Sequence, residues 1–283
     1  MDGDGFLSAS RVAIWGLGLM GGSLALALKG KCRAVFGIDA DPAAVDLARA
    51  DGIVDAAGTR PGELLPEADV VVLATPVRTI LRLLGELPGL HPGPAVVLDL
   101  GSTKRAVLAA MARLPERFDP LGGHPMCGKE KNSLRYAEAA IFQKAPFALT
   151  ALPRSSAQAR ALGKALALAV GACPLWLDAA QHDRWVAATS HAPYLLANAL
   201  AGATAVECAP MIGPGFRSTA RLAGSSPAMM LDILATNADH IAGALAGARE
   251  RIEQMERLLA DEQFEALAAL LEDGRARYTA LIG

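Results

Sequence analysis

The chain has 283 residues, of which 52% are hydrophobic, and its formal net charge at pH 7 is -2. This length is enough for two domains, and a nearly neutral chain with interspersed charges excludes an electrostatic footprint for nucleic acid or an anionic membrane. Four cysteines show no metal-ligand spacing and predict no metal site and a reducing, cytoplasmic compartment: Cys32, Cys127, Cys173 and Cys208.

The first part of the chain alternates between strand patterns and helix patterns. Short apolar runs rich in Val, Leu and Ala are typical of strands that are buried on both faces of a sheet. Helical segments separate most of these runs, and this alternation predicts a parallel, doubly wound sheet of the Rossmann type. The predicted strands are residues 11–16, 34–39, 69–75, 95–100, 147–152 and 174–178.

After Asp178 the strand pattern stops, and the rest of the chain is predicted to be helical. We therefore place a domain boundary there. It separates a dinucleotide-binding domain over 1–178 from an all-helical domain over 179–283 that serves substrate binding and dimerisation. Apolar residues recur at helical spacing after Ser226, which indicates a core face. We expect part of this face to be buried in a homodimer formed by the C-terminal helices.

We expect neither a secretory leader nor a membrane span. The first ten residues are acidic and lack the basic and apolar regions of a leader, so we expect them to be flexible. The segment 186–206 is apolar enough to raise the question of a span. It contains His191 and Pro193, however, which favour a buried core helix.

A G-x-G-x-x-G pattern, formed by Gly16, Gly18 and Gly21, follows the first predicted strand and opens a helix. Glycine at these places permits a tight turn, lets the backbone approach a pyrophosphate and brings helix close to strand. Asp39 ends the second strand, near the spacing at which an acid binds the adenosine ribose. A carboxylate there repels a 2'-phosphate and predicts NAD rather than NADP. Asp39 could instead be a turn residue before Asp41.

Four further residues complete the predicted cofactor site. Leu19 and Met20 lie within the glycine pattern itself. Thr75 and Pro76 follow the third predicted strand, where the ribose and nicotinamide half of the cofactor has to pass. Ligands of open α/β sheets bind outside the carboxyl ends of the strands, which is where these residues are expected.

Two polar residues follow later strand patterns and are candidates for chemistry. Ser102 comes directly after the run 95–100, and His124 lies between glycines and a proline. A neutral imidazole accepts a proton at physiological pH, so His124 is suited to act as a general base. Ser102 could instead cap the helix that begins at 103 or 104.

The chain resembles the prephenate/arogenate dehydrogenases of tyrosine biosynthesis. The resemblance runs in order from Arg11 to the last helices, and several motifs lie outside the nucleotide-binding part. The motifs are GLGLMGGS, LATPV, DLGSTK, GGHPMCG, QHDRWVAATSHAPYLLANAL, GPGFRSTARLAG and SSPAMMLDI. Such a set is far more specific than a glycine pattern alone.

The resemblance implies a role for each candidate residue. His124 would take the proton of the ring hydroxyl while hydride leaves the same carbon for NAD, and Ser102 would orient that hydroxyl. His191 and Arg221 match positions that line the substrate pocket, with Arg221 as the cation for a carboxylate. A guanidinium forms a planar fork that suits this task. Loss of carbon dioxide would then give an aromatic product.

Several alternatives remain open at this point. Arogenate, which would give tyrosine directly, shares the ring, the hydroxyl and the carboxylates, and we favour prephenate on overall resemblance only. A 3-hydroxyacid dehydrogenase would require a catalytic lysine, but no lysine follows Lys164. A non-catalytic NAD-binding module would not need His124. His182 and Asp183 resemble a feature of the family, but we favour their interpretation as a helix cap and a surface pair. Because the chain ends soon after its last helix, we expect any feedback by tyrosine to act at the active site.

Overall fold

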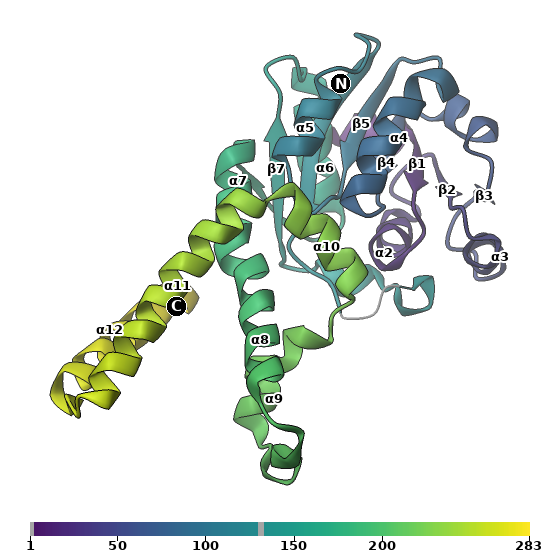
Figure 1. Cartoon of the computed structure of the whole chain (residues 1–283). Coiled ribbons are helices and arrows are strands. Elements are labelled where there is room, and N and C mark those ends of the chain that lie inside the picture. The colour runs from purple at the N-terminus through teal and green to yellow at the C-terminus, as the bar shows by residue number, and fades with distance from the viewer. Residues whose placement is uncertain (1–2, 130–132) are drawn as a thin grey trace. The chain divides into compact units, whose positions relative to one another are not determined.

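The computed structural model describes residues 3–129 and 133–283 (Figure 1). The chain divides into two compact units, Met1–Asn237 and Ala238–Gly283. The predicted domain boundary near Asp178 lies inside the first unit and stays a prediction.

A single eight-stranded sheet forms the centre of the first unit, with the strand order β3-β2-β1-β4-β5-β6-β7-β8. The strands β1 to β6 run parallel to one another, so the predicted doubly wound α/β fold is confirmed. The bounds are β1 (Arg11–Trp15), β2 (Ala34–Ile38), β3 (Ala56–Gly58), β4 (Val70–Leu73), β5 (Ala95–Asp99), β6 (Phe118–Pro125), β7 (Pro146–Ala151) and β8 (Cys173–Trp176).

The last two strands depart from the predicted all-parallel sheet. β7 pairs antiparallel with β6, and β8 is parallel to β7. A parallel pair requires a long crossover, usually a helix. The described parts of the connection between β6 and β7 contain only two short 3-10 turns, η3 (Leu134–Tyr136) and η4 (Ala139–Phe142). The chain therefore returns beside β6 in the opposite direction.

Helices cover both faces of the sheet (Figure 1). Alternate side chains of β1 point to opposite faces: Val12 and Ile14 join one core cluster, and Ala13 and Trp15 join the other. The first cluster contains residues of α1 (Gly3–Ala9), α2 (Leu19–Leu28), α3 (Pro42–Ala50) and α6 (Ala157–Ala169). The second contains residues of α4 (Val77–Leu90), α5 (Arg105–Met111) and the 3-10 turn η2 (Leu65–Glu67), which follows η1 (Pro61–Glu63).

The N-terminal segment is more ordered than the sequence predicts. We expected the first ten residues to be flexible. The first two lie outside the described residues, but α1 packs against α6 and Leu7 is buried. A Cβ atom at Gly3 would lie only 2.3 Å from the carbonyl oxygen of Ala161, so the two helices approach each other closely. This expectation was wrong because a seven-residue helix has almost no periodicity of its own, and its order comes from tertiary packing.

The rest of the first unit is helical. Tyr194, Met230 and Ile233 form a small core of their own, and an ion pair of 2.6 Å joins Arg78 of α4 to Asp232 of α10. The bounds are α7 (Ala179–Val186), the π-helical turn η5 (Ala187–His191), α8 (Ala192–Ala203), η6 (Val206–Met211), α9 (Pro214–Ala220), η7 (Arg221–Gly224) and α10 (Pro227–Thr236).

The second unit is a pair of helices, α11 (Ala238–Ala260) and α12 (Phe264–Ile282). Asp273 of α12 is bonded to Arg277 at 3.0 Å and also to Arg251 of α11. Several large apolar side chains of this unit are exposed: Ile252, Leu259, Phe264, Leu271, Tyr278, Leu281 and Ile282.

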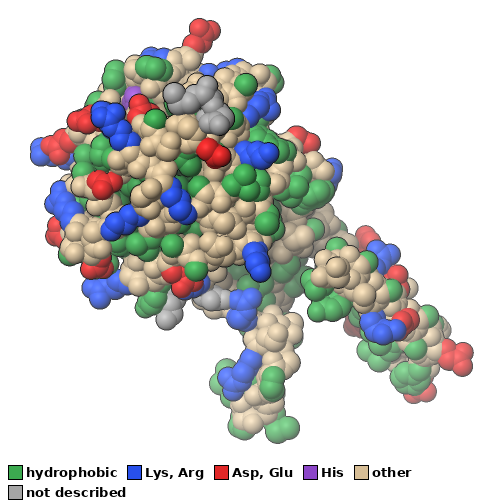
Figure 2. All heavy atoms as spheres, turned by 180° about the vertical axis from the view of Figure 1, so that it is seen from behind, with side chains coloured by type: hydrophobic (Ala, Val, Ile, Leu, Met, Phe, Trp, Pro, Cys, Tyr) green, Lys and Arg blue, Asp and Glu red, His purple; other side chains and the backbone are tan. Residues whose placement is uncertain are grey.

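Across the described ranges, no helix combines the length and the apolar character that a membrane crossing requires. On the face of the molecule shown in Figure 2, lysine and arginine side chains are interspersed with aspartate and glutamate. The same described residues contain no group of three or more His, Cys, Asp or Glu side chains arranged to hold a metal ion.

Candidate active site

The glycine turn between β1 and α2 leaves no room for a side chain at Gly16 or at Gly21. Gly16 has a φ of +112°, and a Cβ atom there would lie 2.7 Å from the carbonyl oxygen of Ala74. A Cβ atom at Gly21 would lie 1.8 Å from the carbonyl oxygen of Gly16. Gly18 is the residue before α2, which begins at Leu19. The turn therefore exposes backbone N–H groups at the start of a helix, as a phosphate-binding turn does.

Asp39 lies beside this turn, at the carboxyl end of β2. Its carboxylate accepts hydrogen bonds from the backbone N–H of Leu17 at 2.6 Å and of Asp41 at 2.9 Å. The hydrogen bond from Asp41 is the contact expected if Asp39 is a turn residue, which is the alternative interpretation of this acid. The contact with Leu17 ties the acid to the glycine turn. The carboxyl group is only partly buried, and its predicted role toward a ribose remains a proposal.

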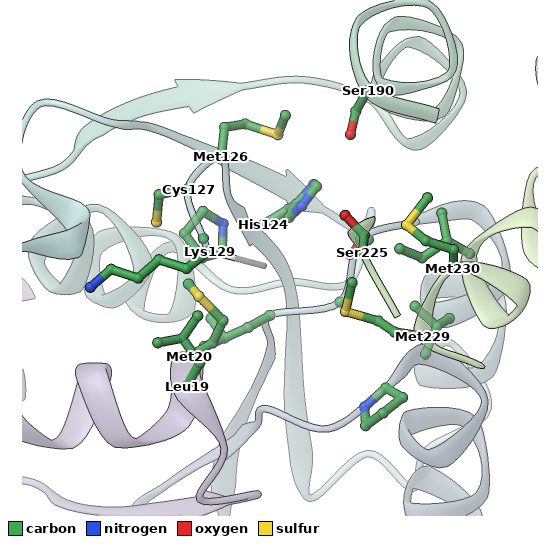
Figure 3. Close-up of a pocket in the computed structure, with 18 of the residues that line it drawn as sticks. Leu19, Met20, His124, Met126, Cys127, Lys129, Ser190, Ser225, Met229 and Met230 are labelled. Carbon is green, nitrogen blue, oxygen red and sulfur yellow. The ribbon is translucent and has the colours of Figure 1, made fainter. Parts of the chain in front are cut away.

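A cavity of about 560 Å³ opens at the carboxyl ends of β4, β5 and β6. Its walls come from the glycine turn, from these strand ends and from the helical segment that follows the sheet. Figure 3 shows His124, Ser190 and Ser225 pointing into it. The cavity brings together eight of the predicted site residues: Gly18, Leu19, Met20, Thr75, Pro76, Ser102, His124 and Arg221. The other four, Gly16, Gly21, Asp39 and His191, are not among its lining residues.

Thr75 gives an independent sign that a polar ligand fits here. Its hydroxyl oxygen is buried within the described structure and has no hydrogen-bond partner there, yet the residue lines the cavity. Buried polar groups are nearly always paired, and an unpaired one in a cavity wall fits a site that a bound group completes. The residues present therefore fit a dinucleotide whose ribose and nicotinamide half passes the end of β4.

A buried carboxylate fixes the two strand ends that carry Ser102 and His124. Asp99 accepts hydrogen bonds from the backbone N–H of Gly101 at 2.8 Å and of Gly123 at 3.3 Å. It also forms an ion pair with Lys104, and both side chains are 0% exposed. Burial raises the pKa of Asp99 and lowers the pKa of Lys104, while their mutual attraction opposes both shifts. Ser102 and His124 are thus held by the backbone of their immediate neighbours.

His124 lies near the end of β6 and is half-buried. Its Nδ1 atom is 2.9 Å from Nε2 of His182, and the two rings meet edge to face. Burial, and then the charges of His182, Lys104 and His191, hold the pKa of His124 well below its usual value of 6.5. The imidazole is therefore neutral at pH 7 and able to accept a proton.

His182 and Asp183 are not the surface pair that the sequence suggested. The exposed fraction of the side chain is 1% for His182 and 0% for Asp183. Asp178 caps α7 instead, accepting a hydrogen bond from the backbone N–H of Gln181 at 2.8 Å. That interpretation was wrong because α7 lies against α5 and the end of β6, a contact between distant segments that no local pattern reveals.

His191 is buried in the π-helical turn η5, where its Nδ1 atom is 3.3 Å from the amide nitrogen of Asn237. Burial lowers the pKa of His191 to about 4. The described lining of the cavity includes its neighbours Thr189 and Ser190 rather than His191 itself. Its role in binding the substrate stays a prediction.

Arg221 lies in η7, is exposed and lines the cavity. The same wall contains residues that the sequence did not single out, among them Ser190, Ser225 and Met229. A second cation, Lys129, lines the cavity and pairs with Glu138 at 2.8 Å. Ser190, Ser225 and Met229 lie within motifs of the family resemblance, but only the folding of the helical segment over the sheet brings these side chains to one place.

A doubly wound sheet with a glycine turn, a neutral histidine and a cation around one cavity defines a dinucleotide-binding oxidoreductase. Matches to family models identify the family within this class. Residues 24–173 match the nucleotide-binding domain of prephenate dehydrogenase, and residues 178–273 match its dimerization domain. The chain belongs to the prephenate dehydrogenase family, and the resemblance found in the sequence is confirmed.

Individual relatives agree with the family models. The prephenate dehydrogenase of Bacillus subtilis (strain 168) is 34% identical to this chain in a region that covers 81% of this chain and 65% of that protein's length. The structure of A. aeolicus prephenate dehydrogenase with hydroxyphenyl propionate and NAD+ matches with a TM-score of 0.88 at 28% identity, covering 97% of this chain and 99% of the other. Synechocystis arogenate dehydrogenase matches with a TM-score of 0.81 at 26% identity, covering 96% and 100%.

Proposed function

We propose that this chain catalyses the NAD-dependent oxidative decarboxylation of prephenate to 4-hydroxyphenylpyruvate. The observation that carries the proposal is that His124, Ser102 and Arg221 line one cavity together with Gly18 of the glycine turn. Three groups from distant parts of the sequence are thus available to one small substrate beside a nucleotide-binding turn. Membership of the prephenate dehydrogenase family supports this reaction over the other oxidations that the fold serves.

The electrons and atoms of the reaction balance with these residues. NAD+, when bound, accepts a hydride from the ring carbon that carries the hydroxyl group. His124 accepts the hydroxyl proton as the carbonyl forms. The ring carboxylate then leaves as carbon dioxide, and its bonding electrons enter the ring, which becomes aromatic. His124 is suited to accept the hydroxyl proton because its imidazole is neutral at pH 7.

Two other side chains bind and orient the substrate. Arg221 presents a guanidinium at the cavity wall, where it pairs with a substrate carboxylate. Ser102 lies on the neighbouring strand end and orients the ring hydroxyl toward His124. His191 contacts Asn237 and directly follows the lining residues Thr189 and Ser190, which supports its proposed place in the substrate site.

The cofactor is NAD rather than NADP. The carboxylate of Asp39 accepts a hydrogen bond from the backbone N–H of Leu17 in the glycine turn, which supports its proposed role of binding the adenosine ribose and repelling a 2'-phosphate. Gly16 and Gly21 shape the turn for the pyrophosphate. The relative from A. aeolicus holds NAD+, which supports the same choice.

Arogenate is the second candidate substrate, and it would give tyrosine directly. The likeness to Synechocystis arogenate dehydrogenase over nearly the whole chain favours it as the alternative. The two substrates differ only in a keto or an amino group on the side chain. Prephenate is preferred because the family models and the Bacillus relative carry that name.

The proposal extends to the oligomeric state and the cellular location of the protein. We propose a homodimer formed through the C-terminal helices, supported by the dimerization-domain match over 178–273 and by the exposed apolar side chains of α11 and α12. We also propose a cytoplasmic location, supported by four cysteines that are all free thiols.

The test is a direct assay of the purified full chain with NAD+ and each substrate. Prephenate should produce reduced cofactor and carbon dioxide in equal amounts, and arogenate should react more slowly. The same assay with NADP+ should give a kcat/KM lower by roughly ten-fold or more, since a 2'-phosphate would meet the carboxylate of Asp39. Faster turnover of arogenate would reverse the substrate assignment. Absence of turnover with both substrates would refute the proposed reaction.

A further inference from the structure

Three side chains form one hydrogen-bonded line from the interior of the first unit to the cavity. Oδ1 of Asp183 lies 2.9 Å from Nδ1 of His182, and Nε2 of His182 lies 2.9 Å from Nδ1 of His124. Asp183 and His182 are almost completely buried, while His124 reaches the cavity (Figure 3). Buried polar side chains aligned in this way are costly unless each donor meets an acceptor.

The line has one consistent arrangement of protons when both rings are neutral. An ionised carboxylate only accepts, so the nitrogen of His182 that faces Asp183 carries the proton. Nε2 of His182 is then an acceptor, and Nδ1 of His124 has to be the donor that meets it. Nε2 of His124 is left with its lone pair, and it is the ring nitrogen that remains for the cavity.

The carboxylate that starts the line is firmly held. Asp183 accepts hydrogen bonds from the backbone N–H of Lys104 at 2.6 Å and of Arg105 at 2.9 Å, and the guanidinium of Arg105 lies 3.3 Å away. Burial acts to raise the pKa of Asp183, but the bonds from His182 and from these two backbone groups lower it on balance. Asp183 is therefore ionised at neutral pH, as the arrangement of protons above requires, and the guanidinium of Arg105 lies beside its carboxylate.

We propose that His182 and Asp183 are positioning residues for the reaction, which hold His124 in the tautomer and orientation that leave Nε2 free to accept the substrate's hydroxyl proton. The inference rests on the proposed function, because it assigns a task within that reaction. When the proton moves from the hydroxyl to Nε2, His124 becomes an imidazolium that still donates through Nδ1 to His182. Asp183 stabilises this positive charge through the intervening ring, and no proton needs to leave the line.

The kinetic test compares two substitutions of the middle residue. His182→Leu removes both ring nitrogens, whereas His182→Gln places a carbonyl oxygen within reach of Nδ1 of His124. For the leucine variant we expect kcat with prephenate and NAD+ to fall by roughly 10²-fold with little change in KM. We expect the glutamine variant to recover at least about ten-fold of this loss, since an acceptor for the Nδ1 proton is restored.

His91→Leu is the matched control. His91 is also buried, at 3% exposure, and also makes two hydrogen bonds, to Ala68 and Gly93, but it lies away from the cavity lining. Its loss should lower thermal stability as much as His182→Leu does and leave kcat nearly unchanged. Equal losses of kcat in the two leucine variants would show a structural effect only and overturn the proposal.

A spectroscopic measurement decides the proposal independently of turnover. The chain has only five histidines, so selectively 15N-labelled histidine in the full-length protein can be assigned by substitution. We expect His124 at neutral pH to be protonated at Nδ1 and unprotonated at Nε2, and to lose this preference in His182→Leu. A proton on Nε2 of His124 in the wild-type protein would overturn the proposal. Normal tautomers without turnover of prephenate or arogenate would instead refute the proposed function alone.

Discussion

The two walls of the cavity are built in different ways. The strand-end wall presents Ser102 and His124, and the residues before them, Gly101 and Gly123, donate backbone hydrogen bonds to Asp99. The Asp99–Lys104 ion pair is completely buried. The helical wall consists of η7, α10 and parts of η5 and α8, and its cation Arg221 is exposed. The residues proposed for bond-making are thus fixed by buried hydrogen bonds, whereas the cation proposed for substrate recognition lies exposed on a short helical turn.

The largest effect is expected from the base on the strand-end wall. His124→Asn should lower kcat by roughly 10³-fold, because general-base catalysis is lost while the shape of the wall is kept. The dissociation constant of NAD+, measured by quenching of intrinsic fluorescence, should change by less than about three-fold, since the glycine turn is intact. A variant that retains more than a tenth of wild-type kcat would show that the base lies elsewhere.

The buried ion pair beneath that wall should matter mainly for stability. Lys104→Met leaves the carboxylate of Asp99 without its cation in a fully buried place, which should cost about 3–5 kcal/mol in the free energy of unfolding. The double variant Asp99→Asn with Lys104→Met removes both charges and should recover part of this loss. Urea unfolding monitored by circular dichroism measures both. A cost below about 1 kcal/mol would mean that the wall does not depend on this pair.

The acid sensitivity of the fold should come partly from the buried histidine of the helical wall. The pKa of His191 in the folded protein is about 4, below the usual value of 6.5, so protons bind the unfolded chain more tightly. The stability that this neutral ring contributes is complete above pH 6.5 and is lost as pH falls toward 4. Between pH 7 and pH 5, His191→Gln should lose about 2 kcal/mol less stability than the wild-type protein. Parallel pH profiles for both proteins would contradict this.

The smallest effect is expected from the exposed cation of the helical wall. Arg221→Ala should raise KM for prephenate by roughly 30-fold and change kcat little, since a charge-assisted pair to a carboxylate contributes about 2 kcal/mol of binding. Arg217→Ala is the control: Arg217 is exposed in the preceding helix α9 and does not line the cavity. Equal effects of the two substitutions on KM would show that only the general positive charge of this segment matters.

The sequence predicted the parts of the molecule that depend on local patterns. The glycine turn requires glycine at Gly16 and Gly21 for steric reasons, and this requirement is visible in the sequence. The parallel strands β1, β2, β4 and β5 are short apolar runs and were predicted correctly. β6 was not predicted as a strand, because its carboxyl half, LGGHP, has the composition of a turn.

The line from Asp183 to His124 could not be predicted from local patterns. His182 and Asp183 lie at the start of a helix, where an acid and a histidine are ordinary surface residues. Their burial depends on Lys104 and Arg105, whose backbone N–H groups bond to Asp183 from a distant part of the chain. The sequence held two signals: the adjacent pair of titratable residues, which many exposed helices share, and its place in the motif QHDRWVAATSHAPYLLANAL of the family resemblance.

Asp183 also limits how this protein can be recombined with its relatives. Its carboxylate follows the predicted boundary near Asp178, yet it accepts hydrogen bonds from the backbone of Lys104 and Arg105 on the sheet side of that boundary. A chimera joined at this point would inherit the acceptor from one parent and the two donors from another. Exchange of the helical segment should therefore yield an active enzyme only under two conditions. The incoming segment must carry the acid, and its first helix must pack against α5 so that the acid reaches the two backbone N–H groups.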